Sequence, residues 1–467
     1  MFRKARRVHM VGIGGAGMSG IAEVLLNLKY PVTGSDLATS VATRRLRKLG
    51  ATVHRGHRAE YVRDADVVVV SSAVQPSNPE VVEARRLKIP VIPRAEMLAE
   101  LMRMKYGIAV GGAHGKTTTT AMIAEVLDHA GLDPTVVIGG RVGKLRSGAK
   151  LGRGELLVAE ADESDGSFLK MKPTIAVVTN IDREHLDHYR DLGEIQDAFV
   201  EFLSLVPFYG AVVACLDDRN VRDVLPRVDR KVVSYGLSSD AEITATNIVV
   251  EGFRTRFDVQ MRGRRAGQVE LGVPGRHSVY NSLAAIAVGL ELDVPFATIA
   301  EGLHRFRGVD RRLHRRGEAF GALVLDDYGH HPTEISATLA AVREGFGSRT
   351  VVVFQPHRYT RTHALLEEFG AAFFLADRVI VTAIYAAGEP PIPGIDGAAV
   401  ANALVRHGHP AVTYEPDRER IPAQLKDAVH PGDIVLTLGA GDVWQVAERF
   451  VRLGAGRPER VHAGGRR

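Results

Sequence analysis

The chain has 467 residues, more than one hydrophobic core usually contains, and this length predicts about three domains. Hydrophobic residues make up 45% and charged residues 25%, an ordinary globular composition that argues against an intrinsically disordered chain. The net charge of +5 is small and aromatic residues make up only 6%, so the composition does not favour a nucleic-acid-binding surface.

The single cysteine, Cys215, cannot form an internal disulfide bond, which is typical of a reducing compartment. It lies in an apolar run, so a buried strand thiol is a better interpretation than a nucleophile. The basic N-terminus resembles a signal peptide, but His9 and several glycines interrupt the apolar run that follows. No apolar run approaches the roughly 18 residues of a membrane span, and we expect a cytoplasmic enzyme without a membrane segment.

Three successive blocks of the chain alternate short apolar runs with helical patterns, which predicts α/β domains with doubly wound sheets. In the first block strands are expected at 7–13, 31–36 and 65–73, helices at 18–29 and 42–50, and a short strand with a helix within 89–106. In the second, strands are expected at 107–112, 154–162, 173–181 and within 231–274, and helices at 117–131, 198–206 and 274–292. In the third, strands are expected within 322–332, 350–358, 377–385 and 432–442, and the tail after about 454 is expected to be flexible.

A first glycine-rich loop follows the first predicted strand. Gly12, Gly14 and Gly17 fit the pattern G-x-G-x-x-G, and Asp36 ends the next strand about 20 residues on. Such glycines let the backbone approach a diphosphate, and the following helix supplies N–H donors. NAD is one candidate ligand, but every nucleoside diphosphate has the same needs.

A second phosphate-binding pattern is VGGAHGKTTTT, residues 110–120. It lacks the usual first glycine, since Val110 stands six residues before Lys116. Its context of strand, loop and amphipathic helix is nevertheless that of a P-loop, with Lys116 on the outer phosphate charge and Thr117 on magnesium. A triphosphate site in the second block weakens a dehydrogenase interpretation of the first.

Carboxylates follow the next predicted strand of the second block. Glu160, Asp162, Glu163 and Asp165 lie in VAEADESDGSF, where a Walker-B-like carboxylate would meet Mg²⁺, although such clusters are also common in solvated loops. His185 follows the strand after that, and by itself suits a helix cap or the surface at least as well as a magnesium ion, which prefers oxygen ligands.

Later polar positions suggest contacts with a nucleotide and with small anions. His277 and Asn281 are four residues apart and would share a helix face, suited to a nucleotide base or to ordinary capping. The third block concentrates arginines, whose guanidinium forks bind phosphate and carboxylate groups, together with histidines and acids. This set is Arg311, Arg312, Asp326, Asp327, His330, His331, His357, Arg358 and Arg361.

Together these motifs resemble the Mur ligases, the ATP-dependent amide ligases of peptidoglycan synthesis, and in particular the branch that joins L-alanine to UDP-N-acetylmuramate. The resemblance spans nearly the whole chain through GIGGAGMSGIA, VTGSD, HGKTTT, EADESDGSF, TNIDREHLDHY, GRHSVYN, DDYGHHPTEI and FQPHRYTR. It implies a Rossmann-like domain for the UDP substrate at 1–104, a central P-loop ATPase domain with a mostly parallel sheet at 105–313, and a Rossmann-like domain for the amino acid at 314–467.

The resemblance also implies roles for individual residues. The UDP substrate would be bound by Gly12, Gly14, Gly15, Gly17, Ser35, Asp36, Ser71, Ser72 and Asn78. ATP would be bound by Gly112, Ala113, His114, Gly115, Lys116, Thr117, Thr118, His277, Asn281, Arg312 and Asp327, and Mg²⁺ or Mn²⁺ by Thr117, Glu160 and His185. Tyr328, His357, Arg358, Arg361 and Tyr385 would line the L-alanine pocket, and the catalytic set would be Lys116, His185, Arg312, His330 and His357.

The implied reaction has two steps. The lactyl carboxylate of the sugar attacks the γ-phosphate of ATP to give an acyl phosphate, and the alanine amine then displaces phosphate. Lys116, Arg312 and Mg²⁺ would stabilise the transferring phosphoryl group, and the domains would close beforehand because an acyl phosphate hydrolyses in water. His185, His330 and His357 are all candidates for the base that accepts the ammonium proton.

Three alternatives remain at this point: a recycling ligase that attaches a tripeptide, an NAD-dependent dehydrogenase, and a P-loop kinase. The last two leave most of the chain unexplained. Sibling ligases that add later amino acids carry a carbamylated lysine after the histidine loop, but LDHYRDLGEIQDAFVEFLSLV contains no lysine. This departure favours the alanine-adding branch and leaves the ligands of a second metal open.

Overall fold

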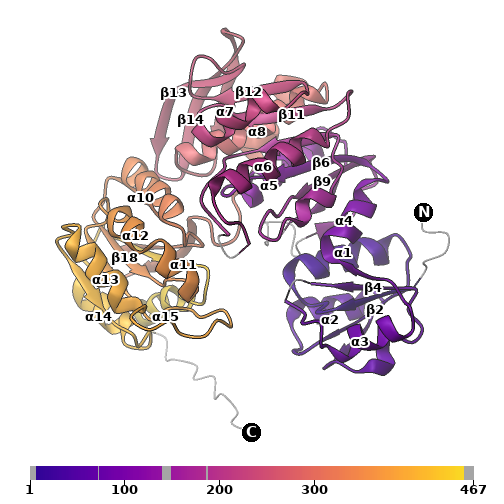
Figure 1. The fold of residues 1–467 in the computed structure, drawn as a ribbon. Coiled ribbons are helices and arrows are strands. Elements are labelled where there is room, and N and C mark those ends of the chain that lie inside the picture. Colours follow the sequence, from indigo (N-terminus) through magenta and orange to yellow (C-terminus); the bar gives the residue numbers. More distant parts are fainter. Residues whose placement is uncertain (1–6, 72, 139–148, 186–187, 457–467) are drawn as a thin grey trace. The chain divides into compact units, whose positions relative to one another are not determined.

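The computed structural model describes residues 7–71, 73–138, 149–185 and 188–456. Ser72 and most of the tail after residue 454 therefore lie outside the described residues. The described chain forms three sheets connected largely by helices (Figure 1), the mixed α/β architecture that the sequence predicts.

The first sheet is entirely parallel and has the order β3-β2-β1-β4-β5. Its strands are β1 (Val8–Val11), β2 (Val32–Asp36), β3 (Thr52–Arg55), β4 (Val67–Val70) and β5 (Val91–Pro93), and its helices are α1 (Ala16–Asn27), α2 (Val41–Lys48), α3 (Pro79–Arg86) and α4 (Arg94–Met102). Strand β3 and helix α3 were not predicted from the sequence. In β3 only Val53 is buried, so this edge strand lacks the continuous apolar run that identifies the central strands.

The second sheet has ten strands in the order β15-β14-β13-β12-β11-β10-β6-β9-β7-β8. They are β6 (Tyr106–Gly111), β7 (Thr135–Val137), β8 (Ala149–Lys150), β9 (Leu156–Glu160), β10 (Ile175–Val178), β11 (Ala211–Cys215), β12 (Val232–Gly236), β13 (Ile243–Glu251), β14 (Arg254–Met261) and β15 (Arg264–Leu271). The phosphate-loop strand β6 lies between β9 and β10 and is parallel to both. The carboxyl ends of these three strands therefore carry the phosphate loop, the acidic stretch and the histidine stretch at one edge.

The helices of this part are α5 (Lys116–His129), α6 (Leu192–Ser204), α7 (Arg219–Val224), α8 (Arg276–Glu291) and α9 (Phe296–Arg305). Helix α6 begins six residues before its predicted start, because Asp191 caps it by accepting a hydrogen bond from the backbone N–H of Glu194 (3.0 Å). Cys215 is buried at the end of β11, as predicted, and burial raises the pKa of its thiol to about 11.

The third sheet has the order β16-β17-β21-β18-β19-β20, with only β16 antiparallel to its neighbour. Its strands are β16 (His314–Ala319), β17 (Ala322–Asp327), β18 (Thr350–Phe354), β19 (Arg378–Val381), β20 (Val412–Tyr414) and β21 (Ile434–Leu438). Its helices are α10 (Pro332–Phe346), α11 (Tyr359–Ala364), α12 (Leu366–Ala372), α13 (Gly397–Arg406), α14 (Ile421–Ala428) and α15 (Trp444–Gly454). Alternating residues of β18 serve two cores, since Val352 and Phe354 belong to one and Val351 and Val353 to the other.

By compactness the chain divides into two units. The first contains the first sheet and most of the second, and the second contains the third sheet together with residues 249–255 and 272–277. One hydrophobic core runs through the first unit, joining Met10 and Leu98 of the first sheet's layer to Phe168 and Phe199 of the second's. The two domain boundaries at 104 and 313 remain a prediction, because this shared core makes the first two blocks one compact unit.

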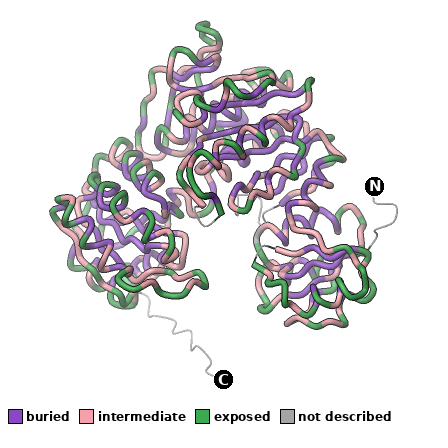
Figure 2. Tube along the Cα trace, viewed as in Figure 1, coloured by how far each residue is buried: buried purple, intermediate pink, exposed green. Residues whose placement is uncertain are grey.

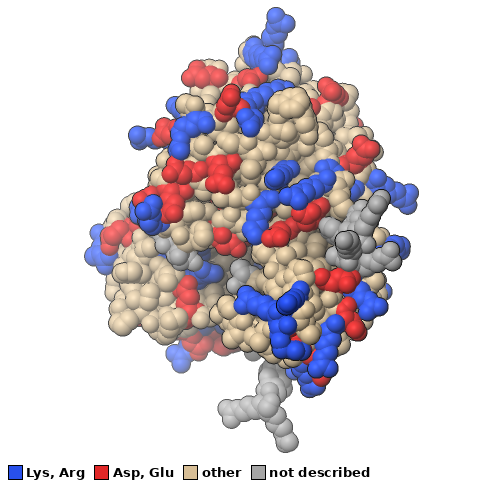
Figure 3. All heavy atoms as spheres, turned by 45° about the vertical axis from the view of Figure 1, so that its right-hand side comes forward, with Lys and Arg blue, Asp and Glu red and all other residues tan. Residues whose placement is uncertain are grey.

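The buried residues of both units follow the central strands and the inward helix faces (Figure 2). On the face drawn in Figure 3, basic and acidic side chains are interspersed, in keeping with the small net charge. Among the described residues, no helix combines the length and apolar character needed to cross a membrane.

Candidate active site

The phosphate loop joins β6 to α5. Gly115 has a φ of 82°, a conformation that favours glycine, and an added Cβ would lie 2.7 Å from Oδ1 of Asn281. The described first turn of α5 holds no acidic side chain, and no side-chain hydrogen bond caps the helix. The N–H groups and the positive end of the helix dipole are therefore available to a phosphate group.

Lys116 is the most strongly engaged side chain of this loop. Its Nζ donates hydrogen bonds to the carbonyl oxygens of Gly112 (2.5 Å) and Ala113 (3.1 Å) and to both carboxylate oxygens of Glu163 (2.8 and 3.0 Å). Burial by itself would lower the pKa of Lys116, but the charge and hydrogen bonds of Glu163, together with the charges of Asp162 and Glu184, outweigh burial and raise it. The ammonium group is therefore protonated, and contact of Lys116 with a phosphate group remains a prediction.

The segment after β10 supports the phosphate loop from its other side. Thr179 Oγ1 donates to the carbonyl oxygen of His114 (2.7 Å), and the backbone N–H of His114 donates to Asn180 Oδ1 (2.8 Å). The ring nitrogen Nε2 of His114 lies 2.9 Å from Asp182 Oδ2. Of this segment only His185 was predicted as a site residue, although Thr179 and Asn180 end the predicted strand 173–181 and Asp182 directly follows it.

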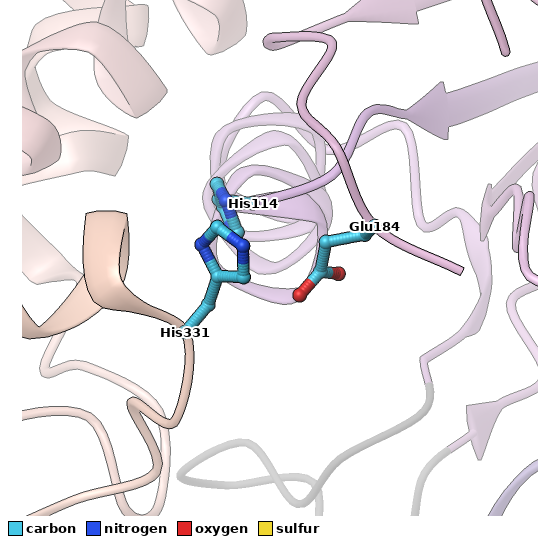
Figure 4. Close-up of side chains that lie close together, drawn as sticks. All are labelled: His114, Glu184 and His331. Carbon is cyan, nitrogen blue, oxygen red and sulfur yellow. The ribbon is translucent and has the colours of Figure 1, made fainter. Parts of the chain in front are cut away.

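Two carboxylates and one imidazole converge beside Lys116. Ligand atoms of Glu163, Glu184 and His185 all lie within 4.8 Å of one another, a grouping that could hold a metal ion. Glu184 also lies beside His114 (Figure 4), and His331 in the same view belongs to the second unit. Of the three predicted metal ligands, this grouping includes only His185.

The other two predicted metal ligands occupy neighbouring positions. Glu160 ends β9, and Thr117 lies in the first turn of α5. Glu160 belongs to no cluster of histidine and carboxylate ligands within the described part of the chain. Their role as metal ligands remains a prediction.

Asn281 lies beneath the phosphate loop. It is buried, and its Oδ1 accepts a hydrogen bond from Thr119 Oγ1 (3.1 Å) and lies against Gly115. This position supports the loop, and contact of Asn281 with a nucleotide base remains a prediction. Its predicted partner His277, at the start of α8, has its pKa lowered to about 4, chiefly by burial and then by the charge of Arg312.

The first glycine loop lies between β1 and α1. The backbone N–H of Gly14 donates to Asp36 Oδ2 (2.8 Å), so Asp36 meets the loop that it was predicted to accompany. The side chain of Ser71 also approaches the loop, since Oγ lies 3.4 Å from an ideal Cβ on Gly12. The predicted residues of the first unit thus converge in part at one sheet edge.

Ser35 and Asn78 are engaged within the protein. Ser35 is fully buried, and its hydroxyl donates to Glu80 Oε2 (2.6 Å) and lies 2.9 Å from Nδ1 of His57. Asn78 caps α3 by accepting a hydrogen bond from the N–H of Glu80 (2.9 Å). Contact of these two side chains with substrate remains a prediction, and the structure assigns them hydrogen bonds that shape the loop ends of the first sheet.

In the second unit, aromatic and histidine rings gather at the carboxyl ends of β17, β18 and β19. The ring of His357 is stacked on Tyr385 with centroids 5.6 Å apart, and lies 5.5 Å from the ring of His330. His330 is in turn 5.5 Å from Tyr328. Burial, followed by the charges of His330 and three arginines, lowers the pKa of His357 to about 3.

Arginines surround this ring cluster. Nη1 of Arg361 lies 3.3 Å from Nδ1 of His357, and the guanidinium of Arg311 lies 4.9 Å from the centroid of Tyr328. Arg358 has a φ of 67° and approaches Glu389. Three arginines therefore border a histidine whose pKa is lowered, an arrangement suited to a small carboxylate.

Arg312 precedes β16 and Asp327 ends β17, the first two strands of the third sheet. Arg312 Nη1 donates to Glu334 Oε1 (3.1 Å). Asp327 is buried and accepts hydrogen bonds from the N–H groups of Leu313 and Gly329 (2.7 Å each). Burial raises the pKa of Asp327 against the charge of Arg312, and its backbone bonds fix the segment that starts the third sheet.

Comparison with known families accounts for this arrangement. Three family models match in succession: "Mur ligase family, catalytic domain" over residues 7–106, "Mur ligase middle domain" over 110–289, and "Mur ligase, glutamate ligase domain" over 311–441. The chain belongs to the Mur ligase family. Within this Mur ligase the two glycine loops fall in different matched regions.

Proteins named UDP-N-acetylmuramate–L-alanine ligase resemble it over nearly their whole length. The protein of that name from Geobacter sulfurreducens is 58% identical over 453 residues, covering 97% of this chain and 98% of the relative. The one from Desulfatibacillum aliphaticivorans is 56% identical over 452 residues, covering 97% and 99%. The similarity is therefore not confined to the phosphate loop.

Solved structures give the same result for the fold. The UDP-N-acetylmuramate-alanine ligase of Thermotoga maritima matches with a TM-score of 0.81 and 31% identity, covering 96% of this chain and 99% of that one. A murein peptide ligase of Psychrobacter arcticus matches with a TM-score of 0.70 at 23% identity, covering 95% and 98%, which shows the shared fold alone.

Proposed function

We propose that this Mur ligase joins L-alanine to the lactyl carboxylate of UDP-N-acetylmuramate at the expense of ATP, in cytoplasmic peptidoglycan precursor synthesis. The observation that carries the proposal is the 58% identity over 97% of the chain to a ligase of that name. Recognition of the alanine and sugar substrates is proposed from these relatives and from the site residues described above.

In the first step the lactyl carboxylate attacks the γ-phosphate of ATP, giving an acyl phosphate and ADP. Lys116 supports this step because its protonated ammonium group is fixed by two loop carbonyls and needs little reorganisation to meet phosphate oxygens. The open first turn of α5 supplies further N–H donors. The positive charge of Arg312 would further stabilise the transferring phosphoryl group. Exclusion of water from the site would protect the acyl phosphate from hydrolysis.

Magnesium fits the acidic edge of the second sheet. Glu163, Glu184 and His185 offer two carboxylates and one imidazole within 4.8 Å, and Thr117 and Glu160 lie on the adjoining first turn of α5 and strand end. Oxygen-rich sites of this kind suit Mg²⁺, and Mn²⁺ also accepts imidazole. When bound, the ion would neutralise phosphate charge.

In the second step the amine of alanine attacks the acyl phosphate carbon and displaces phosphate, and a base must take the ammonium proton. With a pKa of about 3, His357 would be a weak proton acceptor. We propose that His357 contacts the alanine as a neutral ring, while Arg358 and Arg361 attract the alanine carboxylate. His185 and His330 remain as candidates for the base.

The test is phosphate release from ATP with UDP-N-acetylmuramate, measured without an amino acid and with L-alanine, glycine or the L-alanyl-γ-D-glutamyl-meso-diaminopimelate tripeptide. Release that depends on L-alanine supports the proposal. A marked preference for the tripeptide would assign the recycling reaction instead, and release that no amino acid or peptide stimulates would exclude a ligase of this substrate.

A further inference from the structure

Arg94 is the first residue of α4, directly after β5 at the carboxyl edge of the first sheet. Its side chain crosses to the second sheet's acidic stretch, where Nη2 donates to Asp162 Oδ2 (3.2 Å). Both partners remain partly exposed, at 31% and 43% of their side-chain surfaces. The pair is therefore weak enough for another anion to replace one partner.

The other side of Arg94 touches the first glycine loop. An ideal Cβ on Gly17 would lie 2.1 Å from Nη1 and 3.1 Å from Cδ and Cζ of Arg94. Gly17, the third glycine of the fingerprint, therefore leaves the room that the guanidinium occupies. In this chain, a side chain at position 17 would collide with Arg94, in addition to any effect on the approach of a diphosphate to the backbone.

This location is electrostatically unfavourable for a cation on its own. Gly17 lies in the first turn of α1, the positive end of the helix dipole, and the described part of that turn contains no acidic residue. Asp162 supplies the compensating charge from another sheet.

A small cavity lies beside the pair. Its volume is about 70 Å³, and it is lined by Gly17 and Ile21 of α1, Arg94 and Leu98 of α4, and Glu160 and Asp162 after β9. It thus extends from the first glycine loop to the end of β9, beside the phosphate loop. The cavity has room for a few water molecules, and the Arg94 side chain lines it between the two loops.

Resting on the proposed function, we propose that Arg94 is a substrate-binding residue that exchanges Asp162 for the diphosphate of the UDP-sugar. In the free protein Asp162 holds the guanidinium beside Gly17. When the substrate enters, Arg94 forms bidentate hydrogen bonds with diphosphate oxygens at the start of α1. Asp162 is then released at the acidic stretch that serves the second nucleotide.

The experiment measures the dissociation constants of UDP and of UDP-N-acetylmuramate by calorimetry, without ATP or metal. Arg94→Ala should weaken both about tenfold to a hundredfold, because a charge-assisted bidentate contact is lost. Arg94→Lys should retain part of the affinity. Asp162→Asn should tighten both by about two- to fivefold, a gain that misfolding cannot produce.

Two control variants separate binding from simple attachment of the two sheets. Lys170→Ala removes the ion pair between Lys170 and Glu96 (2.9 Å), which joins the same parts of the molecule. Arg103→Ala removes an exposed arginine directly after α4. Both should leave the dissociation constants unchanged. If Lys170→Ala weakened binding as much as Arg94→Ala, the pair would be only an attachment and the proposal would be wrong.

The remaining outcomes are also decisive. Loss of affinity for UDP-N-acetylmuramate but not for UDP would overturn the diphosphate contact, because it would assign Arg94 to the sugar or its carboxylate. Unchanged constants in Arg94→Ala, with normal binding by the unmodified protein, would overturn this inference alone. Failure of the unmodified protein to bind UDP-N-acetylmuramate would instead overturn the proposed function.

Discussion

At the scale of single residues, the pairing of Lys116 with Glu163 explains how a buried lysine stays charged in the absence of nucleotide. Their side chains are only 16% and 4% exposed, so neither charge is well hydrated. Removing one partner of such a pair leaves the other charge buried and uncompensated, whereas removing both relieves the problem.

We therefore predict that Lys116→Met lowers the free energy of unfolding by about 3 kcal/mol, measured by urea denaturation. The double variant Lys116→Met/Glu163→Gln should recover most of that stability. Neither variant should recover activity, since phosphate release should fall at least about a hundredfold without the ammonium group. Equal instability of the single and double variants would show that Glu163 is not the reason for the loss.

Two histidines make the second unit sensitive to acid. The pKa of His277 is lowered to about 4 and that of His357 to about 3, while the unfolded chain takes up these protons near pH 6.5. The stabilising effect of the neutral rings is thus complete above pH 6.5 and is lost as the pH falls toward 4 and 3.

Between pH 7 and pH 5 each ring should account for a loss of about 2 kcal/mol in the free energy of unfolding. The variants His277→Asn and His357→Asn should each reduce the loss by that amount, as measured by urea denaturation at both pH values. His363→Asn is the matched control, since His363 is exposed on α11. A pH dependence that the two variants leave unaltered would contradict the lowered pKa values.

At the scale of secondary structure elements, α5 depends on the conformation of the loop that precedes it. Gly115 at its start and Gly131 just beyond its end both have left-handed φ values, 82° and 78°. They differ in surroundings, since a Cβ at Gly115 would meet Asn281 at 2.7 Å and a Cβ at Gly131 would meet nothing within 4 Å.

Gly131→Ala should cost only backbone strain, about 1–2 kcal/mol. Gly115→Ala should cost more, because of the contact with Asn281, and should also weaken ATP binding, which calorimetry would measure. Adding Asn281→Ser should restore part of the stability of Gly115→Ala but none of that of Gly131→Ala. Equal costs of the two glycine substitutions would refute the close approach.

The elements that the sequence predicted best are central parallel strands such as β4 and β18, whose buried residues form continuous apolar runs. It missed β3, an edge strand with one buried residue, and the short β7 and β8. Helix α6 was predicted too short because Gly193, Glu194, Gln196 and Asp197 interrupt the apolar pattern of its first two turns.

At the scale of the whole molecule, the chain has two compact units with separate cores. Within the second unit, the fully buried Asp326 accepts hydrogen bonds from Arg316 (2.9 Å), Arg311 (3.3 Å) and Thr437 (2.7 Å). Both arginines would lose their buried counter-ion in Asp326→Asn.

We predict that calorimetry resolves more than one unfolding transition. Asp326→Asn should lower the transition of the second unit by several degrees, corresponding to about 2–3 kcal/mol. UDP should raise the transition of the first unit alone, because every residue predicted to bind it lies there. A single transition that both changes move together would show that the two units unfold as one.

The sequence by itself determined the α/β class, the family and the phosphate loop, because a strand, consecutive backbone amides and a helix start are local features that spacing reveals. Tertiary structure alone decided which distant groups meet. Glu163 reaches Lys116 across 47 residues and Asp162 reaches Arg94 across 68, because sheet order brings separate strand ends to one edge. Tertiary structure likewise decided that the hydroxyl of Ser35 donates to Glu80, since no sequence pattern shows which buried carboxylate will accept that hydrogen bond.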